Sequence, residues 1–307
     1  MKHLLRIGTR RSALALWQAE HISARLREVH PGLEVELVKM TTKGDQFLSA
    51  PLREVGGKGL FTREIEDLLL SGEIDLAVHS LKDLPSALPP GLVLAPPPPR
   101  EDPRDALCTR NGQQLADLPQ GARVGTASLR RFVQLLAARP DLRIEPIRGN
   151  VPTRLGRLDG SEPLDGVVLA AAGLRRLGLE RHIGQAFSAR EMVPAVGQGI
   201  LGLELREGDA CVAALVAPLG DAGTAVCATA ERALLASLGA GCSVPMGGHA
   251  WLLGDALHLE ALLGDPTTLA CQRVAGCGVA ADAVTLGESL GAALLAGPLR
   301  HVLQPER

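Results

Sequence analysis

Arginines in glycine-containing loops are the residues of this sequence with the clearest capacity for chemistry. Arginine pairs stand at positions 10–11 and 130–131, and Arg148 and Arg154 bracket a loop that contains Gly149. A guanidinium binds a carboxylate or a phosphate through two parallel hydrogen bonds, which a lysine ammonium cannot form. Because the formal net charge is only -2, the protein is no general polycation. The sequence therefore predicts a site for a small ligand with several acidic groups.

The segment 125–131 places one arginine pair at the expected start of a helix. Thr126 or Ser128 can accept a hydrogen bond from the first helical turn, and free N–H groups at a helix start attract anions. Two arginines at 130–131 oppose the helix dipole there unless an anion is bound. Ser12 follows the first arginine pair in the same arrangement. A plain helix cap is the alternative, but the arginines favour an anion site.

Lys82 and Asp83 follow directly after a buried-type strand expected over residues 74–79. Parallel sheets bind ligands at the carboxyl ends of their strands, and Pro85 restricts the turn. A carboxylate among cations can stabilise a cationic intermediate or transfer a proton. A salt bridge within the turn is the structural alternative, and His79 taken alone is more typical of a buried core histidine.

Two further loops carry reactive or mobile residues. Cys242 lies in the glycine-containing loop 239–245, where its thiol could be a nucleophile or an attachment point, or an incidental loop cysteine. The segment 55–61 contains Lys58, but its spacing does not match a phosphate-binding loop. We expect this segment to be a mobile lid that includes Lys58 and Phe61.

Alternating strands and helices must position these residues. Apolar residues predict a strand over 4–8, a helix over 12–30 and a strand over 33–40, and the same alternation restarts at 106. After residue 218 we expect a long helix over 222–238, two or three strands over 249–274 and a final helix over 282–295. The predicted class is α/β, with two lobes of mixed, mostly parallel sheets and a smaller α+β C-terminal domain. The predicted domains are 1–97 with 198–217, 98–197, and 218–307, the last carrying the Cys242 loop.

Composition limits the class of protein. The 307 residues have a mean hydropathy of +0.14, and no apolar run reaches the length of a membrane span. The six cysteines show no zinc-ligand spacing, so no metal is expected. The N-terminus lacks the apolar core of a secretion signal, which favours a cytoplasmic protein.

The motifs occur together and in order along the chain, at 6–10, 55–61, 77–85, 125–131, 148–150, 194–199 and 241–242. As a set they resemble the porphobilinogen deaminases, also called hydroxymethylbilane synthases, over essentially the whole chain. The resemblance implies two lobes like those of periplasmic binding proteins. It also implies a transferase that condenses four porphobilinogen molecules head to tail, with loss of ammonia, onto a covalently bound dipyrromethane primer. By the same resemblance, the enzyme releases hydroxymethylbilane by hydrolysis.

The same resemblance implies a covalent dipyrromethane cofactor, one per subunit, in thioether linkage to Cys242, with Asp83 as the catalytic carboxylate. Each pyrrole carries an acetate and a propionate, which suits the arginine loops. By resemblance the cofactor binders are Lys82, Thr126, Ser128, Arg130, Arg131 and Arg154, and the substrate binders are Arg10, Ser12, Arg148, Arg154 and Arg176. The expected partner is porphobilinogen, with no nucleic acid and no membrane, and we expect a monomer.

Two other classes of function share some of these features. A two-lobed anion-binding protein of the periplasmic type would have similar lobes and arginine loops, but it would need neither a third domain nor a presented cysteine. A nucleic-acid-binding protein would need a basic groove and aromatic stacking platforms. The net charge of -2 and the aromatic content of 2% argue against it.

Overall fold

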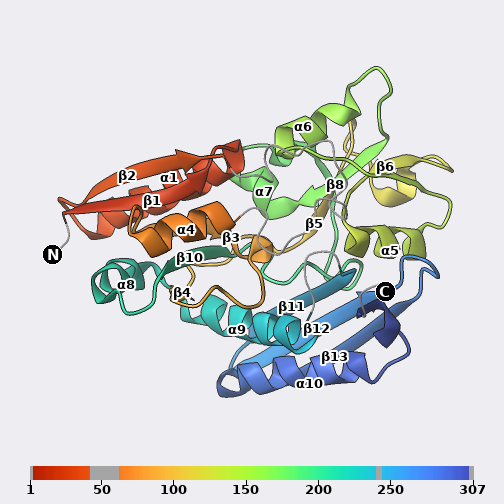
Figure 1. The fold of residues 1–307 in the computed structure, drawn as a ribbon. Helices are drawn as coiled ribbons and strands as arrows, with labels where there is room; N and C mark the ends of the chain where they lie inside the picture. Colours follow the sequence, from red (N-terminus) through yellow and green to blue (C-terminus); the bar gives the residue numbers. More distant parts are fainter. Residues whose placement is uncertain (1–2, 42–61, 240–243, 304–307) are drawn as a thin grey trace. The chain divides into compact units, whose positions relative to one another are not determined.

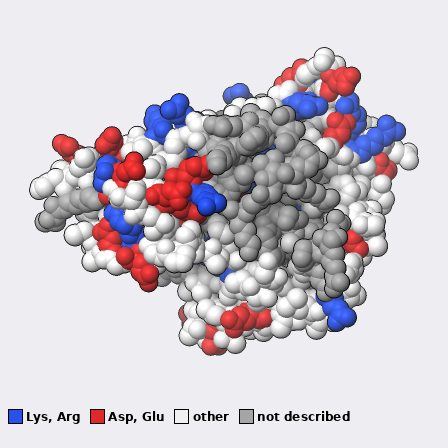
Figure 2. All heavy atoms as spheres, in the orientation of Figure 1, with Lys and Arg blue, Asp and Glu red and all other residues white. Residues whose placement is uncertain are grey.

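The computed structural model describes residues 3–41, 62–239 and 244–303. The chain forms two compact units. The first comprises the described residues up to Glu101 together with Ile200–Ala225, and the second comprises Asp102–Gly199 and the described residues from Val226 onward. Figure 1 shows the helices and strands of both. Acidic and basic side chains are interspersed over the described surface in Figure 2, in agreement with the small net charge.

The first unit is built on a five-stranded sheet in which one strand is reversed. The strand order is β2-β1-β3-β10-β4; β1 is parallel to β2 and β3, whereas β10 is antiparallel to β3 and β4. The strands are β1 (Leu4–Arg10), β2 (Glu34–Met40), β3 (Leu76–Ser80), β4 (Leu92–Leu94) and β10 (Leu201–Arg206), and the helices are α1 (Ala13–Val29), α4 (Arg63–Ser71) and α8 (Ala210–Val216).

Alternation along β3 gives this sheet two covered faces. Leu76 and Val78 belong to the core that includes α1 and α8, whereas Ala77 packs with Ile65 and Leu69 of α4. Successive strand residues point to opposite faces, so each face acquires its own apolar layer. The α4 helix ends at Gly72, whose φ of 77° lies in the left-handed region that favours glycine.

The second unit contains a sheet of the same kind. Its strand order is β7-β6-β8-β5-β9; β6 is parallel to β7 and β8, and β5 is antiparallel to β8 and β9. The strands are β5 (Asp105–Cys108), β6 (Arg123–Gly125), β7 (Arg143–Glu145), β8 (Gly166–Ala170) and β9 (Ile183–Ala186), and the helices are α5 (Leu129–Ala138), α6 (Val151–Leu155) and α7 (Ala171–Arg176).

The C-terminal part of the chain forms an antiparallel three-stranded sheet with two helices against it (Figure 1). Its elements are α9 (Ala222–Ser237), β11 (Met246–Leu253), β12 (Ala256–Gly264), β13 (Cys271–Val279) and α10 (Ala283–Leu295). A methyl group on Gly287 of α10 would lie 2.4 Å from the carbonyl oxygen of Ala230, so glycine permits the close approach of α9 and α10.

The predicted fold class is confirmed: two mixed sheets with helices are followed by a small α+β part. The division into three domains stays a prediction. Two short strands at sheet edges, β4 and β9, were not predicted from the sequence. Among the described helices none alone is long and apolar enough to cross a membrane; the pair Ala210–Leu219 and Ala222–Ser237, bent by 111°, meets that test only when both are taken together.

Candidate active site

A polar pocket in the first unit lies at the carboxyl end of β3. It is lined by Arg10, Ser12, Gln18, Thr62, His79 and Asp83, with apolar neighbours. Because β1 and β3 are parallel neighbours, the residues that follow both strands meet at the same sheet edge. Parallel pairing therefore brings three residues of the predicted site together, although about seventy positions separate them in the chain.

Local hydrogen bonds fix the elements around this pocket. Ser12 is the N-cap of α1, and its hydroxyl accepts from the N–H of Ala15 at 3.3 Å. The residues Leu81–Asp83 form a 3-10 turn, anchored where the N–H of Leu81 donates to the carbonyl of Ile200 at 2.9 Å. Lys82 lies in this turn. Asp83 thus sits on a constrained turn in the wall of a pocket that Arg10 also lines.

A buried acid–imidazole group lies behind the same pocket. Nε2 of His79 is 2.9 Å from a carboxylate oxygen of Glu204 on β10, and both side chains are buried. Glu66 of α4 is also buried. Burial raises the pKa of its carboxyl, the polar side chain of Thr62 opposes that rise, and the nearby charge of Glu204 adds to it. The sequence alone predicts His79 as a core residue, and its side chain is indeed buried. Glu66 and Glu204 were not predicted, because neither belongs to a local motif.

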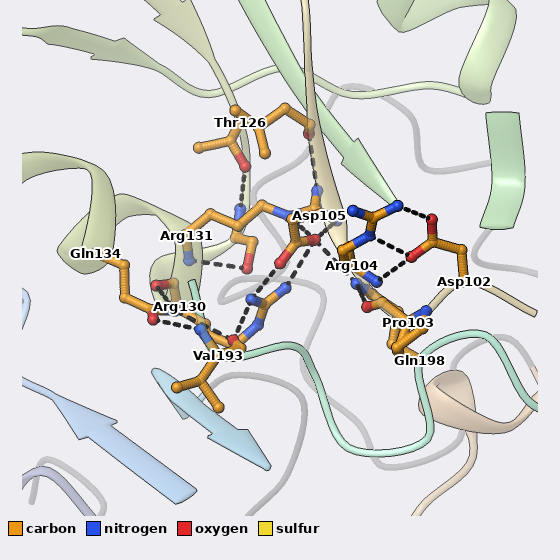
Figure 3. Close-up of polar contacts among 12 residues, drawn as sticks. Asp102, Pro103, Arg104, Asp105, Thr126, Arg130, Arg131, Gln134, Val193 and Gln198 are labelled. Atoms are coloured by element: carbon orange, nitrogen blue, oxygen red, sulfur yellow. Dashed lines mark hydrogen bonds and ion pairs between the residues drawn. The ribbon is translucent and has the colours of Figure 1, made fainter. Parts of the chain in front are cut away.

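In the second unit, Arg130 and Arg131 bind one buried carboxylate, that of Asp105 (Figure 3). Nη1 of Arg130 lies 2.6 Å from Oδ2, and Nε of Arg131 donates to Oδ1 at 2.9 Å. Gln198 also donates to Oδ1, at 3.0 Å. Both arginines are nearly buried, and Asp105 is fully buried.

The charges of the two guanidiniums and of the carboxylate determine the direction of the pKa shift of Asp105 in this cluster. Burial by itself raises the pKa of Asp105, but the guanidiniums of Arg130 and Arg131 outweigh burial and hold that pKa far below its usual range. Burial lowers the pKa of Arg131, while Asp105 opposes that shift. The helix dipole predicts an anion near these arginines, and in the folded protein Asp105 supplies one negative charge there. No local motif in the sequence points to Asp105.

The hydroxyl residues of segment 125–131 act as caps of α5. Ser128 is the N-cap, and its Oγ accepts from the N–H of Arg131 at 3.4 Å. Thr126 is buried, and its Oγ1 accepts from the N–H of Ser128 at 3.2 Å. These bonds fix the backbone that carries the two arginines.

Two of the remaining predicted arginines, Arg154 and Arg176, donate to backbone carbonyls. Arg176 at the end of α7 is buried and donates to the carbonyl of Gly199 at 2.7 Å, next to the Gln198 that reaches Asp105. Nε of Arg154 donates to the carbonyl of Gly149 at 2.7 Å, which folds the loop 148–154 back on itself. Arg148 is half-buried in that loop.

Three predicted site residues, Cys242, Lys58 and Phe61, lie outside the described residues. Of the described cysteines, Cys108 and Cys227 are buried. Within residues 3–41, 62–239 and 244–303 no group of His, Cys, Asp or Glu side chains has the arrangement of a metal site.

Comparison with known proteins decides the family. A model of the porphobilinogen deaminase dipyrromethane-cofactor-binding domain matches residues 5–214, and a model of the porphobilinogen deaminase C-terminal domain matches residues 225–296. This chain belongs to the porphobilinogen deaminase family. Its activity is porphobilinogen deamination in tetrapyrrole biosynthesis, and its cofactor is a dipyrromethane. The family assignment favours the deaminase over the periplasmic-type binding protein and the nucleic-acid-binding protein.

Full-length relatives agree with this assignment. The chain is 57% identical over 261 residues to the porphobilinogen deaminase of Syntrophotalea carbinolica, covering 85% of this chain and 82% of the relative. It is 50% identical over 301 residues to the porphobilinogen deaminase of Thiobacillus denitrificans, with 98% of each chain covered.

Solved structures with partial similarity include a periplasmic aliphatic sulphonate-binding protein of Escherichia coli. Its sequence identity to this chain is 15% and its TM-score is 0.42, and the match covers 77% of this chain and 71% of the sulphonate-binding protein. The BenM effector-binding domain with benzoate has 15% sequence identity to this chain and a TM-score of 0.42. The match covers 69% of this chain and 88% of the BenM domain.

Proposed function

We propose that this deaminase joins porphobilinogen units head to tail on a dipyrromethane attached to Cys242 and releases hydroxymethylbilane by hydrolysis, with Asp83 as the catalytic carboxylate. The observation that supports it is the pocket in which Asp83 stands with Arg10 and Ser12. A carboxylate and a guanidinium at the carboxyl ends of two neighbouring strands suit a substrate that has an amine to lose and carboxylates to bind.

Asp83 handles the positive charge and the proton of the reaction. The porphobilinogen amine leaves as ammonia, so a proton must be available at the leaving nitrogen and a positive charge develops on the ring. An ionised Asp83 stabilises that charge, and its carboxyl oxygen can pass a proton. Arg10, in the same pocket, binds a substrate carboxylate.

The described residues fit a cofactor with several carboxylates. Arg130 and Arg131 share the single carboxylate of Asp105, so the cluster keeps one excess positive charge. We assign Lys82, Thr126, Ser128, Arg130, Arg131 and Arg154 to the cofactor, and Arg148, Arg154 and Arg176 to carboxylates of the growing chain. When bound, the dipyrromethane supplies the pyrrole carbon to which the first substrate unit is joined.

A monomer and a cytoplasmic location belong to the same proposal. Sedimentation of the purified protein over a range of concentrations tests the first, and a mass that rises with concentration would contradict it. Fractionation of the source cells tests the second.

The catalytic assignment is tested by Asp83→Asn, with Asp67→Asn on the exposed surface of α4 as the control. We expect Asp83→Asn to fold and to retain a covalent adduct, but to lose activity by about 10²–10⁴-fold, the usual contribution of a proton-transferring group. Intact mass and steady-state rates measure the two properties. A rate close to that of Asp67→Asn would remove Asp83 from its role.

The attachment site is tested by Cys242→Ala, with Cys277→Ala, an exposed cysteine, as the control. Intact mass should show a two-pyrrole adduct on the control and none on Cys242→Ala. An adduct that persists in Cys242→Ala would place the cofactor elsewhere.

A further inference from the structure

Asp105 is the shared anchor of two arginines that the helix would otherwise separate. Successive residues of an α-helix are rotated by roughly 100° about its axis, so neighbours in sequence do not face one another. Arg130 and Arg131 nevertheless converge on Asp105, through contacts of 2.6 and 3.2 Å from Arg130 and of 2.9 and 2.8 Å from Arg131. Convergence therefore depends on that carboxylate.

Backbone carbonyls complete the fixed geometry of each guanidinium. Nη1 of Arg130 donates to the carbonyl of Val193 at 2.7 Å, and Nη1 of Arg131 donates to the carbonyl of Val168 at 2.8 Å. Figure 3 shows these side chains gathered around Asp105. A planar guanidinium held at several of its N–H groups has one orientation, which leaves its remaining donors aimed in fixed directions.

The charges of the cluster do not cancel. Two guanidiniums and one carboxylate leave one positive charge in excess, and the relative exposures of Arg130 and Arg131 are only 4% and 6%. A buried charge is costly unless an opposite charge accompanies it. Asp105 lowers the excess from two charges to one, so the pair is matched to a single further carboxylate.

We propose that Asp105 is a positioning residue for cofactor loading: it fixes Arg130 and Arg131 in one orientation and sets their excess charge to one, so that together they bind one carboxylate of the dipyrromethane. This inference rests on the proposed role of the two arginines in cofactor binding. Asp105 itself acts only through them.

The segment just before β5 offers a matched control. Asp102 also binds two arginines, with contacts of 2.8 Å to Arg104 and 2.9 Å to Arg175, and its side chain is 6% exposed. These arginines are not among the proposed ligand-binding residues. Asp102→Asn therefore removes a comparable carboxylate without touching Arg130 or Arg131.

The test is the loading of the full-length chain, purified from cells that make no porphobilinogen, with added porphobilinogen at a series of concentrations. Intact mass gives the fraction that carries the adduct. Asp105→Asn should need at least about tenfold more porphobilinogen than the native chain for half loading, which corresponds to about 1.4 kcal/mol. Asp102→Asn should load as the native chain does. Equal loading by Asp105→Asn and Asp102→Asn would overturn the inference.

Two further variants keep the result decisive. If Asp105→Asn does not fold, Asp105→Glu is used instead. This variant keeps the charge but moves the carboxylate by one methylene group. Loading of Asp105→Glu at the porphobilinogen concentrations that load the native chain would overturn the positioning role. The double variant Arg130→Gln with Arg131→Gln separates the two levels of the argument. Normal loading by that double variant refutes the proposed role of the arginines, whereas poor loading by it together with normal loading by the Asp105 variants refutes only the role of Asp105.

Discussion

Replacement of Glu231 by glutamine should strongly destabilise the second unit. Glu231 lies on α9 and is fully buried. One carboxylate oxygen accepts from the N–H of Gly197 at 2.6 Å, and the other accepts from the N–H of Ala250 on β11 at 2.8 Å. The side chain thus ties the segment that precedes Gln198 to the C-terminal sheet.

The magnitude follows from the loss of one acceptor. An amide has a single acceptor oxygen, so in Glu231→Gln the NH₂ group must face one of the two backbone N–H groups. A hydrogen bond to a charged group contributes about 1.5–3 kcal/mol, and a buried donor left without a partner costs about 1–3 kcal/mol. We expect a loss of about 3 kcal/mol, which lowers the melting temperature of a unit of this size by roughly 6–12 °C.

The two tryptophans allow the units to be followed separately. Trp17 lies on α1 in the first unit and Trp251 on β11 in the second. In a Trp17→Phe background, Trp251 fluorescence during thermal unfolding reports on the second unit, where Glu231 lies. Glu288→Gln, on the exposed side of α10, is the matched control and should change stability by no more than about 0.5 kcal/mol. A Glu231→Gln melting curve that overlays this control would refute the reasoning.

Three other predictions concern single positions. Burial raises the folded-state pKa of Glu66 above 4.5, so the folded protein loses stability as the pH rises past that value. The melting temperature of Glu66→Gln should therefore exceed that of the parent by more at pH 8 than at pH 5. An equal difference at both pH values would contradict this prediction. Gly125→Ala places a methyl group 2.9 Å from Cδ1 of Ile147 and should lower the free energy of unfolding by about 1–3 kcal/mol, measured by calorimetry. An unchanged melting temperature would contradict this prediction. Burial raises the pKa of the Cys108 thiol to about 12. Treatment of the native protein with iodoacetamide at pH 8 should therefore label the exposed Cys211 but not Cys108, as measured by peptide mass spectrometry. Rapid labelling of Cys108 would contradict its burial.

Hydrophobic periodicity and chain breakers were enough to predict the longer elements. The helix expected over 12–30 is α1, and it ends just before Pro31 and Gly32. The long helix after residue 221 and the final helix were likewise predicted within one or two residues. The strands β4 and β9 were not predicted because their sequences lack a clear strand signal. The three residues of β4 lie between the prolines at 89–90 and those at 96–99, and β9 contains Gly184 and Gln185, which interrupt an apolar pattern.

The sequence by itself determined the residue types of the site. A carboxylate after a strand, arginines after glycines and a loop cysteine are local patterns, and they were sufficient for the family resemblance that the comparisons confirm. Asp83 and Arg10 could be placed at one sheet edge by the topology rule for parallel strands.

Only the tertiary structure decided which groups partner these residues. Asp105 is 25 residues from Arg130, and Gln198 is 93 residues from Asp105. His79 and Glu204 are 125 residues apart. Such pairs leave no periodic signal in the chain, because their contact depends on strand order and on burial. The sequence presents Arg130 and Arg131 as binders of a ligand carboxylate, but in the folded protein both are held by the carboxylate of Asp105. That contact fixes the direction of the two guanidiniums and the net charge of the cluster.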